Sequence, residues 1–342
     1  MKRQTRSQIH GTKKRSKGRE KDQVATVAVE PEREKRGGCF KWILLLLVLM
    51  ILGGCIYLFT IYKGVEKFSN TVYTSRPAEQ QVIREEKIAE VVEKQKPFSL
   101  LVLGVDTGEL GRTEVGRSDV MMVVTINATK NQTTMVSIPR DTRTEIVGHG
   151  TDDKINHAYA FGGVAMSVNS VQKLLGIPID YTVTVNMGDF EKVVDALGGV
   201  EITPLSTFSQ TGYNFVQGQT VHMDGAMALA YARNRYDSGG DYGRQERQRQ
   251  LMGAMLKSAK SFDTLTSMQT IFNSLETVVK TDINFTELQN IVKNYGSALN
   301  KINQVQLSGS GQMIDGIYYD ITNPDSLAQV QKTLKAELEI KE

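Results

Sequence analysis

An uncharged apolar run near the N-terminus constrains this chain more than any other feature. No charged residue lies between Trp42 and Tyr62, and the first half of the segment is almost entirely leucine, isoleucine and valine. About twenty helical residues, each rising about 1.5 Å, cross the roughly 30 Å hydrocarbon core of a bilayer. The rings of Trp42, Tyr57 and Tyr62 lie near the ends of the run, where aromatic side chains meet the headgroups. We therefore predict a transmembrane helix over residues 42–62.

The charge in front of this helix predicts its orientation. Residues 1–41 hold 13 Lys and Arg but only 5 Asp and Glu, so the positive-inside rule places this basic tail in the cytoplasm. A cleaved signal peptide and a buried core helix are the two alternatives. The long leader and the lack of an Ala-x-Ala site argue against the first, and the length of the uncharged run argues against the second. We expect an uncleaved signal anchor in the cell membrane, single-pass, with an extracellular C-terminal part.

The rest of the chain is mildly acidic, which argues against a nucleic-acid partner because phosphate backbones require a basic face. The two cysteines, Cys39 and Cys55, lie at or inside the predicted membrane segment, so no disulfide supports the exported part. This cysteine usage is typical of exported proteins of Gram-positive bacteria.

After the helix, residues 63–96 form a charged stretch that we interpret as a stalk or a helical arm. The spacing of Ile83, Ile88, Val91 and Val92 indicates a short amphipathic helix within it. Residues 97–342 then form a single extracytoplasmic domain.

Three apolar segments open this domain and predict neighbouring strands. They cover Leu100–Val105, Val120–Ile126 and Thr134–Ile138, and their lack of alternation indicates burial on both faces. Beyond them, periodicity predicts helices over 163–175, 189–197, 224–232, 244–260 and 326–338, and strands over 181–185 and 200–202. The predicted fold class is therefore α/β, with a mixed central sheet flanked by helices on both faces in three layers.

Charged residues stand at the ends of the three opening strands. They are Asp106, Arg117, Asp119, Arg140 and Asp141. If the strands pair as a meander, these side chains share one rim of the sheet, a common place for ligands. Carboxylates among arginines suit a divalent metal together with a phosphate group. The alternative is that they are solvated turn residues that form minor ion pairs.

A second group of polar residues lies on the helix predicted over 244–260 and just before it, in the segment Tyr231–Arg235. On a helical wheel, Arg244 and Gln248 extend the apolar stripe formed by Leu251, Met252, Met255 and Ala259, whereas Arg249 points away and should be solvated. Inward-pointing Arg and Gln near a helix N-terminus, capped by Asp241, favour an anion pocket. A basic, solvated first turn is the alternative.

Six motifs in order resemble the LytR–CpsA–Psr family. They are Leu103–Asp106, Gly116–Asp119, Ser137–Thr142, Lys154–Ala158, Ala232–Arg235 and Asp241-x-Gly243-Arg244-x-x-Arg247-Gln248, with the region Val183–Ile202 between the fourth and fifth. The resemblance implies a catalytic extracytoplasmic domain, a metal site with Mg²⁺ or another divalent ion on Asp106 and Asp119, and a hydrophobic lipid tunnel under the sheet. It also implies that Asp106, Asp119, Arg117 and Arg140 are catalytic and that the pyrophosphate binds Arg117, Arg140, Arg233, Arg235, Arg244 and Gln248.

Such proteins are phosphotransferases that move a glycopolymer, such as teichoic acid or capsule, from an undecaprenyl-pyrophosphate carrier to peptidoglycan. The product is a phosphodiester, and undecaprenyl phosphate is released. Two alternatives stay open: a non-catalytic envelope regulator that binds polyprenyl phosphate, and a lipid pyrophosphatase. Asp106, Asp119 and Asp141 are the candidates for a general base, if the reaction needs one.

Overall fold

The computed structural model describes residue 50 and residues 59–106, 116–234, 239–260 and 273–340. Contacts divide the chain into residues 1–54 and residues 55–342. The basic tail over residues 1–41 and most of the predicted transmembrane helix over 42–62 lie outside the described residues, so both stay predictions. Among the residues that are described, no helix combines the length and apolar character needed to span a bilayer.

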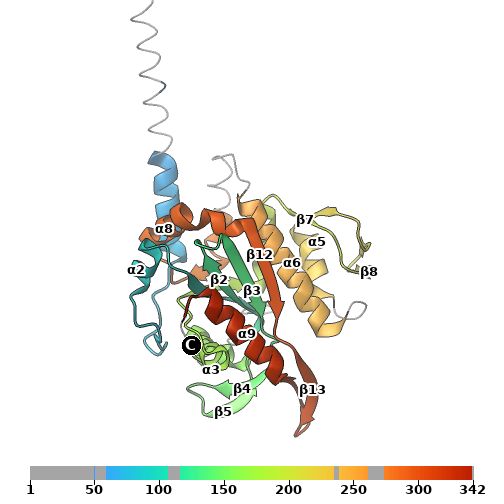
Figure 1. Cartoon of the computed structure of the whole chain (residues 1–342). Helices are drawn as coiled ribbons and strands as arrows, with labels where there is room; N and C mark the ends of the chain where they lie inside the picture. Colours follow the sequence, from blue (N-terminus) through green and yellow to red (C-terminus); the bar gives the residue numbers. More distant parts are fainter. Residues whose placement is uncertain (1–49, 51–58, 107–115, 235–238, 261–272, 341–342) are drawn as a thin grey trace, which may run out of the picture. The chain divides into compact units, whose positions relative to one another are not determined.

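A six-stranded mixed sheet forms the centre of the 55–342 unit (Figure 1). The predicted meander is confirmed, because β1 (Phe98–Val105), β2 (Ser118–Asn127) and β3 (Gln132–Ser137) pair antiparallel in chain order. The sheet is completed by β6 (Tyr181–Asn186) parallel to β1, β11 (Val279–Thr281) antiparallel to β6 and β12 (Lys301–Gln306) parallel to β3. Each strand of the meander begins two residues before its predicted start.

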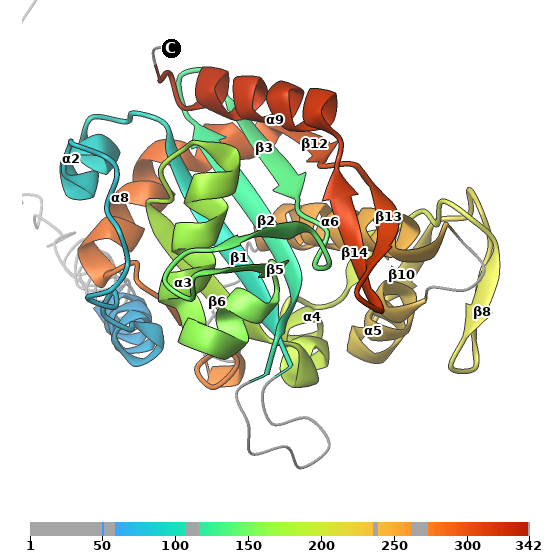
Figure 2. The same cartoon turned by 90° about the horizontal axis from the view of Figure 1, so that it is seen from below.

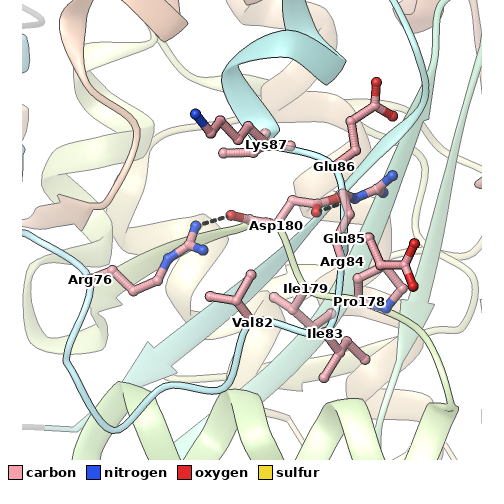
Figure 3. Close-up of a pocket in the computed structure, with 11 residues that line it drawn as sticks. Arg76, Val82, Ile83, Arg84, Glu85, Glu86, Lys87, Pro178, Ile179 and Asp180 are labelled. Carbon is pink, nitrogen blue, oxygen red and sulfur yellow. Dashed lines mark hydrogen bonds and ion pairs between the residues drawn. The ribbon is translucent and has the colours of Figure 1, made fainter.

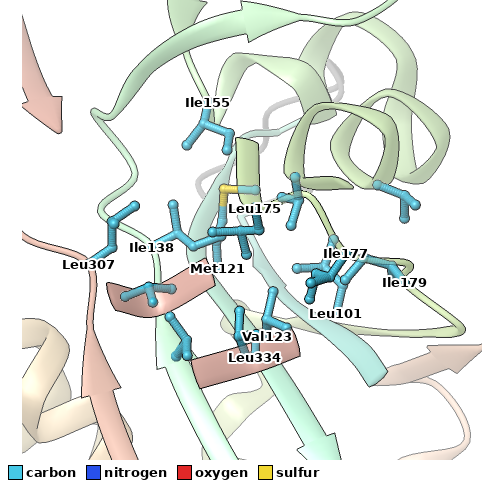
Figure 4. Close-up of a cluster of buried hydrophobic side chains, with 14 of the residues drawn as sticks. Leu101, Met121, Val123, Ile138, Ile155, Leu175, Ile177, Ile179, Leu307 and Leu334 are labelled. Carbon is cyan, nitrogen blue, oxygen red and sulfur yellow. The ribbon is translucent and has the colours of Figure 1, made fainter. Parts of the chain in front are cut away.

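Helices cover both faces of this sheet, which confirms the predicted three layers (Figure 2). On one face α3 (His157–Leu175) and α9 (Pro324–Glu337) pack on alternate residues of β1 and β2, including Leu101 and Met121, which Figure 4 shows in one continuous cluster. On the other face α6 (Gly240–Lys260) packs on the intervening residues, Val102 and Met122. Burial of both faces explains why these strands show no alternation.

Glycines divide helix α3. It begins at His157, six residues before the predicted start, and Gly162 and Gly163 interrupt it with non-helical backbone angles. Gly163 has φ of +59°, a conformation that glycine adopts at low cost. The sequence pattern predicted only the regular part that follows this kink.

Several elements, some of them strands too short to display alternation, were not predicted. They are β4 (Arg143–Ile146) with β5 (Thr151–Lys154), β8 (Phe208–Gln210) with β9 (Tyr213–Phe215), β13 (Gly309–Ile314) with β14 (Ile317–Thr322), β10 (Val221–Met223) and α8 (Phe285–Tyr295). Strand β10 pairs with β7 (Val200–Ile202), which was predicted, while α4 (Phe190–Ala196) and α5 (Gly225–Arg233) lie within two residues of the predicted bounds.

The stretch over residues 63–96 is an arm docked on the domain. Residues 59–72 are helical, and the amphipathic helix predicted farther along is α2 (Ile88–Glu93), with Val91 and Val92 fully buried. Arg84 binds both carboxylate oxygens of Asp180, at 2.6 and 2.8 Å (Figure 3). Figure 3 also shows the small pocket beneath this arm, about 160 Å³ in volume. Because Arg84 and Asp180 neutralise each other there, we interpret this pocket as structural.

Candidate active site

A β-bulge shapes the rim of the sheet at Asp119. Gly104 of β1 pairs with Val120 of β2, but the next residue, Val105, pairs with Ser118. Asp119 is therefore an extra residue in β2, and its side chain is 35% exposed. Bulges of this kind redirect a side chain and are frequent beside active sites. Sequence alone gives no sign of the bulge, because it depends on the register between two strands.

Asp106 follows the last residue of β1 and is held against the start of β2. Its Oδ1 atom accepts a hydrogen bond of 2.6 Å from the backbone N–H of Arg117, and its own N–H donates to the Arg117 carbonyl at 3.2 Å. A side chain at Gly116 would lie 2.5 Å from that Oδ1 atom, so only glycine permits this close approach. The Arg117 side chain is exposed at the rim.

Arg140 connects the rim carboxylates into a chain of alternating charges. Its Nη1 atom lies 2.8 Å from Asp119 Oδ1, and its Nε atom lies 3.5 Å from Asp141 Oδ2. Lys154 then binds the other oxygen of Asp141 at 2.9 Å. The rim therefore combines carboxylates and cations in fixed positions.

An apolar cavity of about 60 Å³ lies between the sheet and α6, near this rim but lined by none of its charged residues. Gly104 and Val120, which flank the positions of Asp106 and Asp119, form part of its wall. The remaining lining comes from Val102, Met122, Val185, Met187, Phe190, Val193, Ala232, Gln248, Leu251, Met252 and Met255. An apolar cavity beside a charged rim suits an amphipathic ligand with an anionic head.

Helix α6 brings the second predicted group to the same place. Gln248 lines the cavity with Leu251, Met252 and Met255, as its place on the apolar stripe predicts. Arg244 is buried at 4% exposure but is not among the residues that line the cavity. Arg233, at the end of α5, is exposed beside the cavity residue Ala232. Arg235 and the side chain of Asp241 lie outside the described residues.

The prediction for Arg249 is wrong. Its side chain is only 5% exposed, and its Nη2 atom donates to Gln306 Oε1 of β12 at 3.2 Å. The wheel showed one buried stripe, but α6 packs against β12 as well as against the cavity, so two of its sides are buried. Burial lowers the pKa of Arg249 below its usual value.

Comparison with known proteins identifies the family. The LytR_cpsA_psr family model matches residues 59–336. The chain belongs to the LytR_cpsA_psr family. It is 40% identical over 301 residues to an Enterococcus faecalis protein named polyisoprenyl-teichoic acid–peptidoglycan teichoic acid transferase TagU, covering 87% of this chain and 96% of that protein.

Solved structures of family members share the fold. The crystal structure of Bacillus subtilis TagU is 39% identical, with a TM-score of 0.59, and covers 72% of this chain and 99% of that chain. The family protein YwtF (TagT), solved with bound octaprenyl pyrophosphate lipid, is 29% identical, with a TM-score of 0.61, and covers 78% of this chain and all of that one.

The rim of this family member fits a hard divalent cation only with help from its substrate. Among the described residues no group of three His, Cys, Asp or Glu side chains converges as metal ligands. Mg²⁺ is usually held by one or two carboxylates, with substrate phosphates and water completing the shell. Asp106 and Asp119, on adjacent strand ends, match that donor set.

Proposed function

We propose that this protein transfers a teichoic acid or related glycopolymer from an undecaprenyl-pyrophosphate carrier to peptidoglycan, with release of undecaprenyl phosphate. The observation that carries this proposal is the apolar cavity whose wall includes Val120, the residue next to Asp119 of the charged rim. A lipid pyrophosphate has the same two parts, an apolar chain and a strongly anionic head. The names of the relatives, polyisoprenyl-teichoic acid–peptidoglycan transferases, support the reaction.

The lipid chain would enter between the sheet and α6. A volume of about 60 Å³ is too small for a whole polyprenyl chain, so binding requires the wall to move. Met187, Met252 and Met255 supply much of that wall. Methionine is unbranched and flexible, so these side chains can change rotamer and admit ligands of different length.

The chemistry follows from the charges at the rim. A hydroxyl of peptidoglycan attacks the phosphorus next to the sugar and loses its proton, for which Asp106, Asp119 and Asp141 are the candidate acceptors. The new P–O bond forms as the bond to undecaprenyl phosphate breaks. Arg117 and Arg140 offset the charge on the phosphoryl oxygens, and Arg233, Arg244 and Gln248 hold the pyrophosphate on the cavity side. A divalent ion on Asp106 and Asp119 would supply further neutralisation when it is bound.

The decisive experiment is a transfer assay. Purified protein is incubated with a short lipid-linked glycan, peptidoglycan and Mg²⁺, and a covalent glycan–peptidoglycan product is expected. Loss of product in Asp119→Ala assigns the product to this site. Lipid binding without product would favour the regulator, and release of phosphate without a glycan product would favour the pyrophosphatase.

We also propose that the helix over residues 42–62 spans the cell membrane and anchors the domain on its outer face. Protease added to intact protoplasts should digest the chain beyond Gly64 and leave the basic tail protected. Full protection of the whole chain would reject this topology.

A further inference from the structure

Arg247 lies in the family motif of α6 yet makes contacts unlike those of a ligand-binding arginine. It follows Arg244 by three residues, and its side chain is only 2% exposed. Its Nε atom donates to the carbonyl of Tyr231 at 3.1 Å, and its Nη2 atom donates to the carbonyl of Asn234. Both carbonyls belong to the end of α5 or to the residue just after it.

The surroundings of Arg247 explain how a buried charge is tolerated there. The guanidinium lies 5.2 Å from the ring centre of Phe208 and 6.0 Å from that of Tyr231, within the range of cation–π attraction. The C-terminal end of a helix carries partial negative charge and carbonyls that need donors. Burial lowers the pKa of Arg247, but an arginine stays charged at neutral pH.

This contact joins the two helices that carry the proposed pyrophosphate ligands. Arg233 is the last residue of α5, whereas Arg244 and Gln248 lie on α6. Ala232 and Gln248 face the same cavity, so the spacing of the two helices sets the width of the site. The Tyr231 hydroxyl of α5 also donates a hydrogen bond of 2.6 Å to Gln250 Oε1 of α6, about one helical turn after Arg247.

We infer that Arg247 is a positioning residue that fixes the end of α5 against α6, and thereby sets the spacing of the pyrophosphate ligands without contacting the ligand itself. This inference rests on the proposed function, because it takes Arg233, Arg244 and Gln248 as those ligands. A pyrophosphate head engages both helices at once. A monophosphate head can be held by the residues of one helix alone, so its affinity should depend less on the spacing of the two helices.

The test compares two buried arginines of the same helix. Arg247→Met removes the link to α5, and Arg247→Lys keeps the charge but cannot reproduce the planar fork. Arg249→Met is the matched control, because Arg249 is equally buried but faces β12. For each full-length variant in detergent, thermal melting is measured together with the affinities for polyprenyl pyrophosphate and polyprenyl monophosphate.

We expect Arg247→Lys and Arg247→Met to lose pyrophosphate affinity about tenfold, the effect of one charge-assisted contact, while monophosphate affinity changes less than about twofold. Arg249→Met should keep the wild-type ratio of the two affinities. An unchanged ratio in folded Arg247→Lys, or parallel losses for both lipids that follow the melting temperature, would overturn the inference. Wild-type protein that prefers pyrophosphate but forms no glycan product would reject the proposed transfer and leave the positioning role standing.

Discussion

The two faces of the central sheet are built from the same strands, yet they are filled in different ways. On the α3 side, Leu101, Leu103 and Val123 belong to a cluster of buried apolar residues (Figure 4), and none of these three lines a described cavity. On the α6 side, Val102 and Met122 border an apolar cavity. Helix α6 also buries three arginines, whereas α3 buries none.

This difference suggests that one face of the sheet serves mainly stability and the other mainly ligand binding. A close-packed face gains the full free energy of apolar burial and dispersion. A face with a void gives up part of that gain, and buried guanidiniums add a desolvation cost unless they are paired. We therefore expect substitutions on the α3 face to change stability alone, and substitutions on the α6 face to change ligand binding or turnover.

The largest effect is expected at the rim. Asp119→Ala removes the carboxylate that the bulge exposes, and turnover should fall on the order of 1000-fold, because charge stabilisation in the transition state is lost. The melting temperature should stay within a few degrees of the wild type, since the side chain is partly exposed. Chelation by EDTA should give a similar loss that added Mg²⁺ reverses. Full activity in EDTA would remove the metal from the mechanism.

Arg244→Ala should have the next largest effect. It removes one charge-assisted contact, about 2–4 kcal/mol of transition-state stabilisation, which corresponds to roughly 30- to 1000-fold in turnover. Arg244→Lys should recover only part of this loss, because a point charge cannot bind bidentately. Kinetics and thermal melts are measured together. If activity were normal in Arg244→Ala, the α6 side would not be the ligand-binding side.

A smaller effect, on stability alone, is expected on the α3 side. Ile177 is fully buried in that cluster, and Ile177→Val removes one methylene, which should cost about 0.5–1.5 kcal/mol of unfolding free energy. Denaturant titration measures this loss. Turnover per folded molecule should equal that of the wild type. A loss of turnover without a loss of stability would contradict the division between the two faces.

The smallest effect on stability is expected at Val102, on the α6 side, and it should have the opposite sign to that of the core substitution. Val102 lines the cavity, so Val102→Ile adds one methylene to empty space and should stabilise the fold by up to about 0.8 kcal/mol. The same methylene occupies room that the lipid chain needs, so affinity for polyprenyl pyrophosphate should fall. Affinity is measured in detergent beside denaturant titration. Weaker folding with unchanged lipid affinity would show that the cavity is ordinary packing space.

The sequence predicted the parts of the fold that depend on neighbouring residues. The apolar segments around Leu101, Val123 and Val136 are long enough to predict three buried strands, and the short polar link between the second and third is typical of a hairpin. The charged residues at the strand ends then predict a shared rim. Such inferences work because burial and chain connectivity are both local in sequence.

The parts that depend on packing between distant segments could not be predicted. The bulge at Asp119 follows from strand register, and the cavity follows from how α6 approaches the sheet. Arg249 appeared solvated because a helical wheel gives directions but does not say how many sides of a helix are covered. Arg247 lay at the margin of the stripe, and nothing in its spacing indicated that its partners would be carbonyls of α5.

The docked arm has a consequence for where the proposed enzyme works. About 34 residues of extended chain could span roughly 110 Å. Because Arg84 and Asp180 hold this segment against the domain, it does not act as a long, flexible linker to the membrane. In a chain anchored as we propose, the domain can act only on acceptors that lie close to the membrane surface. Acceptor glycans would have to come to it, and newly attached polymer would enter the wall at its innermost layer.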